Sequence, residues 1–202
     1  MSGILFRDFF SVLLMGLIIK LLDDIMDADT DKISEKHNWW NSRGTGIIPY
    51  AFLLFSLSVT LNRDLSVPLF LSAYVVGMIK EHNQKYLLGL PGRAESLLVV
   101  AAALLFFSWT DVLTSLALLL TLQFIDDYLD YSDDQETGEK NFFVILGSGE
   151  SVIGCGILLT ALLFYAPYKL FLVMLAYLCI IIIVEKNLGK RLFKCFQQHK
   201  SS

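Results

Sequence analysis

Two short stretches rich in aspartate carry the side chains best suited to chemistry in this chain of 202 residues. The first, DDIMDADTD, covers residues 23–31, and the second, DDYLDYSDD, covers residues 126–134. Each directly follows an apolar run, so its carboxylates are expected at the end of a hydrophobic helix. Like charges at helical spacing repel one another, and cations placed between them make the arrangement favourable.

The two stretches match at four positions with a single offset of 103 residues, which indicates an internal duplication. Residues four apart on a helix are offset by about 40° around the axis and about 6 Å along it. Aspartates spaced four residues apart therefore lie on one face of their helix, where they form a ladder. The ladders consist of Asp23, Asp27 and Asp31 in the first copy and of Asp126, Asp130 and Asp134 in the second.

Oxygen ligands without histidine or cysteine favour Mg²⁺, which proteins commonly hold with one or two carboxylates plus substrate phosphates. Two facing ladders predict a cage for magnesium ions and a diphosphate, in which Asp27 and Asp130 are expected to be essential for activity. A single acidic run at a helix end is usually a solvated loop, but the matched second copy disfavours that interpretation. A calcium loop of the EF-hand type is disfavoured because its glycine is missing and the spacing is helical.

The elements that position these acids are predicted from the apolar residues, which make up 55% of the chain and give a mean hydropathy of +0.59. This composition excludes an ordinary soluble domain. The apolar blocks predict an all-α polytopic transmembrane bundle, a single domain over residues 1–202, with about seven spans. The predicted spans are residues 4–22, 47–62, 65–80, 95–109, 111–125, 150–166 and 168–184.

The orientation of the bundle follows from its basic residues. With seven spans, 13 of the 16 lysines and arginines fall on one side of the membrane, and only Arg7, Arg63 and Lys169 fall on the other. The positive-inside rule assigns the larger set, and with it both acidic stretches, to the cytoplasm. The basic tail, residues 184–202, is expected to contact anionic membrane lipid. Three scattered cysteines without a CxxC pair indicate neither a disulfide framework nor a zinc site.

These motifs resemble those of the UbiA superfamily of intramembrane prenyltransferases. The first family motif, usually written NDxxDxxxD, reads DDIMDADTD here, with Asp23 where asparagine is usual. The second, DxxxDxxxD followed by G-x-K, is matched by DDYLDYSDDQETGEKNF, which adds Gly138 and Lys140 to the ladder. The resemblance covers roughly residues 15–165. Family members typically have nine transmembrane helices, with the motifs at the ends of the second and sixth. Here the motifs follow the first and fifth of seven predicted spans, so one helix at each end of the family pattern is expected to be missing.

The resemblance implies an enzyme whose aspartates hold two Mg²⁺ ions on a polyprenyl diphosphate, with an apolar bundle around the isoprenoid chain. Basic residues near the motifs are candidates for contacting the diphosphate, although each also fits a role in topology or in headgroup binding. These candidates are Lys140, Lys80, Arg43, Lys85 and Arg93.

Aromatic rings stabilise a cation within about 6 Å of their faces. Tyr74, Tyr128 and Tyr131 lie near the motifs in the sequence and are candidates for stabilising an allylic carbocation.

Three functions remain open on the sequence. The first is a prenyltransferase that joins an isoprenoid to a lipophilic or aromatic acceptor, and the second is a terpene cyclase of the UbiA type, which needs no acceptor. The third is a non-enzymatic membrane protein that binds cations. A CDP-alcohol phosphotransferase is excluded because its DGxxAR signature is absent, and no nucleic-acid partner is expected.

Overall fold

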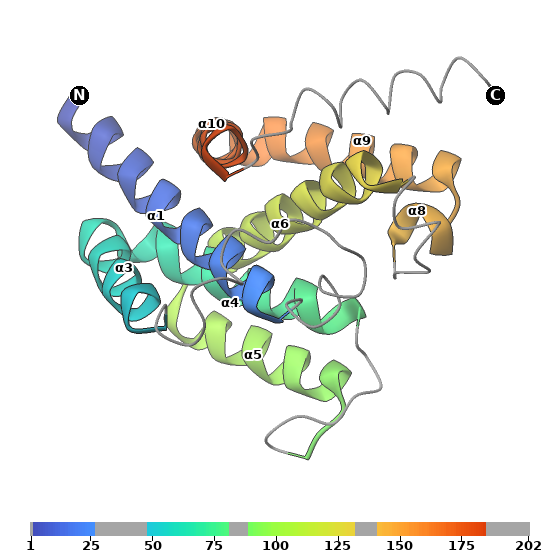
Figure 1. Ribbon diagram of the computed structural model, residues 1–202, viewed down its shortest axis with the longest axis horizontal. Helices are drawn as coiled ribbons and strands as arrows, with labels where there is room; N and C mark the ends of the chain where they lie inside the picture. The colour runs from blue at the N-terminus through green and yellow to red at the C-terminus, as the bar shows by residue number, and fades with distance from the viewer. Residues whose placement is uncertain (1, 27–47, 81–88, 132–140, 185–202) are drawn as a thin grey trace.

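The computed structural model describes residues 2–26, 48–80, 89–131 and 141–184, and every element in these ranges is a helix (Figure 1). The all-α prediction is therefore confirmed. The helices are α1 (Ser2–Met26), α3 (Ile48–Leu61), α4 (Arg63–Lys80), α5 (Gly92–Phe106), α6 (Trp109–Leu129), α8 (Phe142–Ile145), α9 (Ser148–Tyr165) and α10 (Pro167–Val184).

Seven of these helices coincide with the seven apolar segments of the sequence, and only the four-residue α8 was not expected. The boundary between α5 and α6 differs from the prediction, because α5 ends at Phe106 rather than at residue 109. Ser108 explains the difference, since it is the N-cap of α6 and its Oγ accepts the N–H of Asp111 at 3.1 Å. A serine in this position stabilises a helix start, so the chain leaves one helix and enters the next around it.

Helix α6 runs through the middle of the molecule, with α4 and α5 on one side and α9 and α10 on the other (Figure 1). It packs against α4, α5, α8 and α9, whereas α1 packs against α3, α4 and α10. Contacts near the start of α1 indicate the relative directions of the helices. Ser11 bonds to Ser58 near the start of α1, so α3 is antiparallel to α1. Tyr168 bonds to Asp8 at the same end, so α10 runs in the same direction as α1.

The bundle consequently has two ends, which we call the first and the second pole. At the first pole α1, α4, α6 and α10 begin, and at the second pole the same four helices end. The hydrophobic core between the poles includes Val12, Met15 and Ile18, which recur at helical spacing on one face of α1. Leu118 of α6 and Leu172 of α10 are buried in the same cluster.

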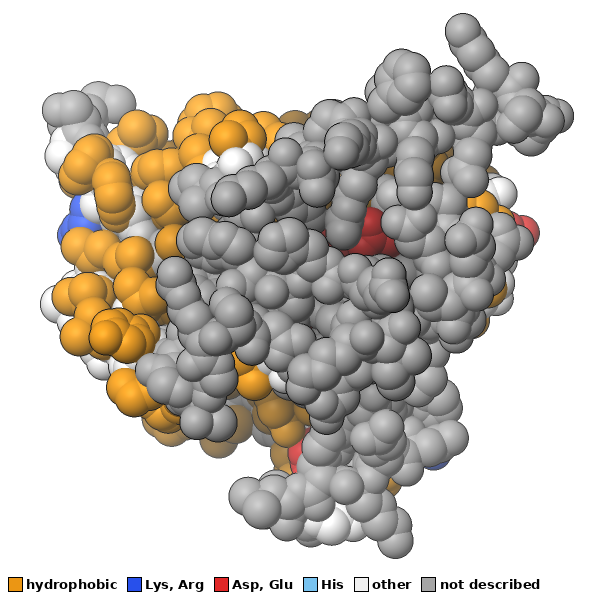
Figure 2. Space-filling model, in the orientation of Figure 1, with side chains coloured by type: hydrophobic (Ala, Val, Ile, Leu, Met, Phe, Trp, Pro, Cys, Tyr) orange, Lys and Arg blue, Asp and Glu red, His pale blue; other side chains and the backbone are white. Residues whose placement is uncertain are grey.

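The outer surface is also strongly apolar. Figure 2 shows hydrophobic side chains over most of the described surface at the side where α3 lies. Leu105 on α5 and Phe164 on α9 are 81% and 82% exposed. Among the described residues, α6 and α9 are long and apolar enough to cross a membrane, and α3 and most of α10 are apolar but shorter. Large exposed apolar faces of this kind fit a hydrocarbon environment rather than water.

Candidate functional site

A cavity of about 180 Å³ lies between α1, α4, α6 and α10. Most of its wall is aliphatic, with Met15, Val76 and Leu122 among the lining residues. Its polar residues come from the second half of three helices and so lie toward the second pole. They are Lys20 and Asp23 on α1, Gln123 and Asp126 on α6, and Tyr177 on α10.

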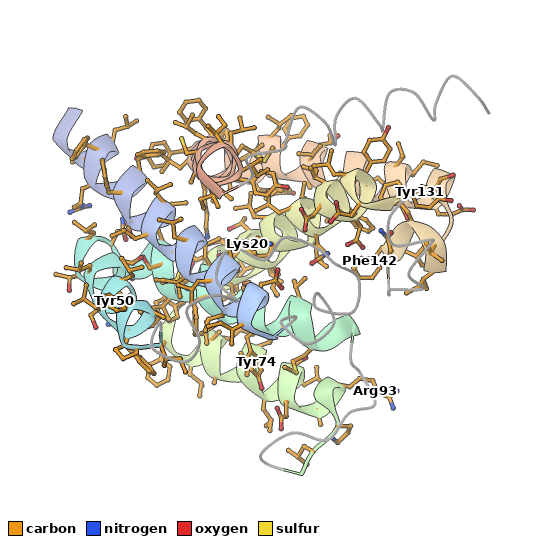
Figure 3. The ribbon with its side chains drawn as sticks, in the orientation of Figure 1. Lys20, Tyr50, Tyr74, Arg93, Tyr131 and Phe142 are labelled. Carbon is orange, nitrogen blue, oxygen red and sulfur yellow. The ribbon has the colours of Figure 1, made fainter. Side chains whose placement is uncertain are left out.

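Asp23 lies three residues before the end of α1. Its Oδ2 is 3.6 Å from the Nζ of Lys20, one helical turn earlier. The two side chains are 57% and 37% exposed, so this ion pair is partly open to solvent. Figure 3 shows Lys20 near the centre of the molecule, where α1 passes in front of α4 and α6. A positive and a negative side chain therefore lie together in the cavity wall.

Asp126 occupies the equivalent place on α6, three residues before that helix ends. Its side chain is half-buried, and the hydroxyl of Tyr177 donates to its Oδ1 at 3.4 Å, a long distance for an O–H···O hydrogen bond. Asp23 and Asp126 are separated by 103 residues in the sequence, yet they line one cavity from two different helices. The first acids of the two motif copies are thus brought together.

The other acids of the motifs are only partly described. Helix α6 ends at Leu129, and Asp130 follows as its C-cap with φ −97° and ψ 2°. Its N–H still donates to the carbonyl of Asp126 at 3.0 Å, so these two residues are one turn apart, as the spacing predicted. The described part of the predicted ladder therefore runs from Asp126 to Asp130, where α6 ends; aspartate is a poor residue for a helix interior. Asp27, Asp31 and Asp134 lie outside the described residues.

Asp127 has a different role from the aspartate before it. It is only 3% exposed, its Oδ1 accepts the Nε2 of Gln123 at 2.5 Å, and its Oδ2 accepts the N–H of Phe142 at 2.7 Å. Asn141 donates its Nδ2 to the carbonyl of Asp127 at 2.7 Å and accepts the N–H of Phe143 on its Oδ1. Asp127 thus fastens the start of α8 to the end of α6.

Two of the five basic candidates for diphosphate contact lie in the described part of the chain. Lys80 is the last residue of α4, one turn beyond Gly77 in the cavity wall, and its side chain is not described. Arg93 is exposed, does not line the cavity, and lies at the edge of the molecule, far from Lys20 in the view of Figure 3. The remaining three, Arg43, Lys85 and Lys140, lie outside the described residues.

None of the three tyrosines predicted to stabilise a carbocation lines the cavity. Tyr74 donates its hydroxyl to Glu95 Oε2 at 2.8 Å, on the α5 side of α4. Tyr128 and Tyr131 pack against Phe143 of α8, with ring centroids 5.5 and 6.3 Å apart. The predicted role does not fit this geometry, because neighbouring positions on a helix face different directions.

Three polar residues of the cavity wall were not predicted as site residues: Lys20, Gln123 and Tyr177. Gln123 and Tyr177 were detectable in principle, since each is a single polar side chain within an apolar run, TLQFI and MLAYLCI respectively. Polar residues inside a membrane segment are costly and therefore often functional. The sequence does not reveal which of them face the interior of the bundle.

The cavity wall contains several groups whose oxygen atoms are suited to coordinating a hard cation. They are the carboxylates of Asp23 and Asp126, the amide of Gln123 and the hydroxyl of Tyr177. Within the described ranges, no group of three or more acidic, histidine or cysteine side chains is arranged to hold a metal ion. Two carboxylates nevertheless fit Mg²⁺, which keeps several waters and takes further oxygens from substrate phosphates.

No family model, curated protein or solved structure matches the chain. The cavity and its polar residues are consequently the structural observations that bear on function.

Proposed function

We propose that this protein is a Mg²⁺-dependent intramembrane prenyltransferase of the UbiA superfamily, which ionises a polyprenyl diphosphate and transfers the prenyl group to an acceptor. One observation carries the proposal: Asp23 and Asp126 line the same largely apolar cavity. Acidic motifs that were merely solvated loops would have no reason to converge in this way. A prenyl diphosphate needs cation ligands and an apolar wall next to each other, and this cavity offers both.

A membrane location and a cytoplasmic site are part of the proposal. The apolar outer faces support the membrane location. The cytoplasmic site is supported by the distribution of basic residues, since the positive-inside rule leaves only Arg7, Arg63 and Lys169 on the other side. Each of these three has a local partner at the first pole. Arg7 pairs with Asp8 at 3.2 Å, and the guanidinium of Arg63 lies 5.2 Å from the ring centroid of Phe107. Lys169 is buried and donates three hydrogen bonds to the first turns of α6.

The chemistry divides between the metal and the chain. Bound Mg²⁺ supplies Lewis-acid stabilisation of the leaving diphosphate as the bond between C1 and oxygen breaks. Asp23 and Asp126 hold the cation from two helices, and Lys20 adds a positive charge where the leaving group gains negative charge. The aliphatic wall binds the isoprenoid chain and excludes water from the carbocation. The ring of Tyr177, in the same wall, offers a face to that cation.

A terpene cyclase of the same superfamily is the second candidate, and one observation favours it. A further cavity, between α4, α5 and α6, has a volume of only about 10 Å³, which is room for a single water at most. This second cavity is too small for a lipophilic acceptor, and an acceptor bound in the cavity of about 180 Å³ would share that space with the prenyl chain. A cyclase avoids this requirement, because the carbocation attacks a double bond of its own chain.

The decisive experiment incubates the purified full-length protein with Mg²⁺ and prenyl diphosphates of several chain lengths, first without any acceptor. Released pyrophosphate is measured and the organic extract is analysed, with a chelator as the control. A transferase is expected to bind the substrate in a Mg²⁺-dependent manner and to form product only when a lipophilic acceptor is added. Cyclic hydrocarbon or terpene alcohol formed without an acceptor would identify a cyclase. Absence of Mg²⁺-dependent consumption at every chain length, with and without acceptors, would leave a non-enzymatic cation-binding protein.

A further inference from the structure

Gln123 connects the cavity to the buried aspartate Asp127. It lines the cavity three residues before Asp126, and its Nε2 donates to the Oδ1 of Asp127 at 2.5 Å. The amide group of a glutamine has a donating and an accepting end. Because the donating end faces Asp127, the carbonyl oxygen, Oε1, points away from that carboxylate and is the end available to the cavity that Gln123 lines.

The orientation of this amide is determined by the surroundings of Asp127. The Oδ2 of Asp127 accepts the backbone N–H of Phe142 at 2.7 Å, and the whole side chain is 3% exposed. Its Oδ1 accepts the Nε2 of Gln123, so the NH₂ group of that amide is turned toward the carboxylate. Turning the amide over would place two acceptors against each other in a buried position, which costs free energy.

We infer that Gln123 is a third oxygen donor of the cavity, beside Asp126, and that Asp127 is the positioning residue that fixes its carbonyl toward the cation. The inference rests on the proposed function, because it concerns the cation of the same site. It also explains why the motif carries two consecutive aspartates. Asp126 faces the cavity, and Asp127 faces the protein and orients a neighbouring ligand, as carboxylates behind metal ligands commonly do.

A purely structural role for Asp127, namely to fasten α8 to α6, is the competing explanation. Both explanations expect that truncation of Asp127 destabilises the protein, so Asp127→Ala does not separate them. Asp127→Asn does. The asparagine must keep its oxygen toward the N–H of Phe142, so its NH₂ group faces Gln123. Gln123 then has to turn its amide, and a donor replaces the acceptor that faced the cavity.

The test measures binding of Mn²⁺, a paramagnetic substitute for Mg²⁺, to the purified full-length protein by electron paramagnetic resonance, with inorganic pyrophosphate present. Loss of a residue that orients a metal ligand typically weakens binding by about 10- to 100-fold, and this loss is expected for Asp127→Asn. Gln123→Met, which has a similar length and no amide, is expected to weaken binding by a similar factor. Thr121→Val is the matched control, since Thr121 is buried on α6 but bonds only to a carbonyl of its own helix and does not line the cavity.

The sharpest test is a double variant that exchanges the amide and the carboxylate between positions 123 and 127. Combining Gln123→Glu with Asp127→Asn keeps the net charge, satisfies the N–H of Phe142 and returns an oxygen to the cavity. Affinity for Mn²⁺ is expected to recover to within about threefold of the wild type, well inside the 10- to 100-fold loss of the single variant. A structural role does not predict this recovery. Unchanged affinity in both Asp127→Asn and Gln123→Met would overturn the inference while leaving the proposed function intact. Absence of Mn²⁺ binding by the wild type would instead contradict the proposed function itself. If Asp127→Asn does not fold, Gln123→Met decides the matter.

Discussion

The two poles of the bundle both contain polar side chains between helices, and they use them in opposite ways. At the first pole, the carboxylate of Asp8 is 5% exposed and accepts hydrogen bonds from three groups. Asn62 donates its Nδ2 at 2.9 Å, Tyr168 donates its hydroxyl at 3.0 Å, and Arg7 approaches at 3.2 Å. The carboxylate thereby joins α1, the start of α4 and the start of α10.

Serine hydroxyl groups at the first pole also join neighbouring helices through hydrogen bonds. The Oγ of Ser66 is 2.6 Å from that of Ser11 and 2.7 Å from that of Ser58, and Ser58 donates to the carbonyl of Ser11 at 2.8 Å. All three residues are fully buried. Small hydroxyl residues of this kind let helices approach closely and bond across their interface, which is how helices associate in membranes.

The second pole carries the same residue types around a cavity instead. Asp126 has one long contact with Tyr177, and Asp23 has one partly exposed ion pair with Lys20. Along α1, Asp8 and Asp23 are only about 22 Å apart, at 1.5 Å per residue. An acid in an apolar segment is therefore not by itself a functional signal. An acid whose partners enclose it stabilises the fold, whereas an acid that borders a cavity is available to a ligand.

The strongest test of this difference is Asp126→Ala. We expect Mg²⁺-dependent turnover to fall by at least about 10²–10³-fold, the loss typical of removing one group that stabilises charge in the transition state. The melting temperature should be unchanged or slightly higher, because an acid of a like-charged cluster is removed. Steady-state rates and thermal unfolding in detergent measure the two effects. Turnover near that of the wild type would remove Asp126 from the site.

Lys20 provides the second test, since it is the basic residue that lines the cavity beside Asp23. Lys20→Met keeps the length of the side chain and removes its charge. A loss of about 2–3 kcal/mol in transition-state stabilisation, or tens- to hundredfold in kcat/KM, is expected. Arg93→Met is the control, because Arg93 is exposed away from the cavity. Equal rates for the two variants would mean that the leaving group does not lie near Lys20.

Much of this fold was predictable because long apolar blocks specify helices by themselves. The ends were less predictable, as the Ser108 cap shows, since a cap depends on one hydrogen bond rather than on a run of residues. Helix α8 was not predicted at all. It has four residues, and its start combines a local N-cap, Asn141, with a tertiary contact, the bond from the N–H of Phe142 to Asp127, which no local pattern encodes.

The candidate site was predictable in part, because the equal spacing of the two motifs picks out acids that lie on two different helices. The offset of 103 residues selected Asp23 and Asp126, and the structure brings both into one cavity. The tyrosines chosen by their distance along the chain do not line this cavity. Tyr128 is two residues from Asp126 and faces α8, whereas Tyr177 is 51 residues away and lines the cavity. Which face of an apolar helix looks inward is decided by packing, and a uniformly apolar segment does not reveal it.

At the first pole, Asp8→Ala tests the opposite half of the comparison. It removes the buried acceptor that half-buried Asn62 and exposed Tyr168 share, and with it the hydrogen bonds that join α1 to the starts of α4 and α10. We expect the free energy of unfolding to fall by about 2 kcal/mol, with turnover nearly unchanged. Asp64→Ala is the control, because Asp64 is exposed in the first turn of α4 and should cost less than about 1 kcal/mol. A large loss of turnover in the folded Asp8 variant would show that the poles are not independent.

The smallest effect concerns two glycines of the cavity wall, Gly16 and Gly77. A Cβ atom on Gly77 would meet no atom within 4 Å, whereas one on Gly16 would lie 2.6 Å from the Cδ1 of Ile180. Gly77→Leu should therefore fold normally, helped by the higher helix propensity of leucine, and fill part of the cavity. Gly16→Ala forces Ile180 into another rotamer, which should lower the melting temperature slightly.

If the cavity holds the prenyl chain, Gly77→Leu shortens the space available to it. The ratio of kcat/KM for long over short prenyl diphosphates should then fall by about tenfold, the lower end of what one methylene is worth in an apolar pocket. Gly77→Ala should give an intermediate ratio, because it adds one carbon rather than four. The graded series matters more than either value, since general damage to the enzyme would lower both rates together and leave their ratio constant. A constant ratio across Gly77→Ala and Gly77→Leu would mean that the chain lies elsewhere, and that the cavity bordered by Asp23 and Asp126 receives the diphosphate alone.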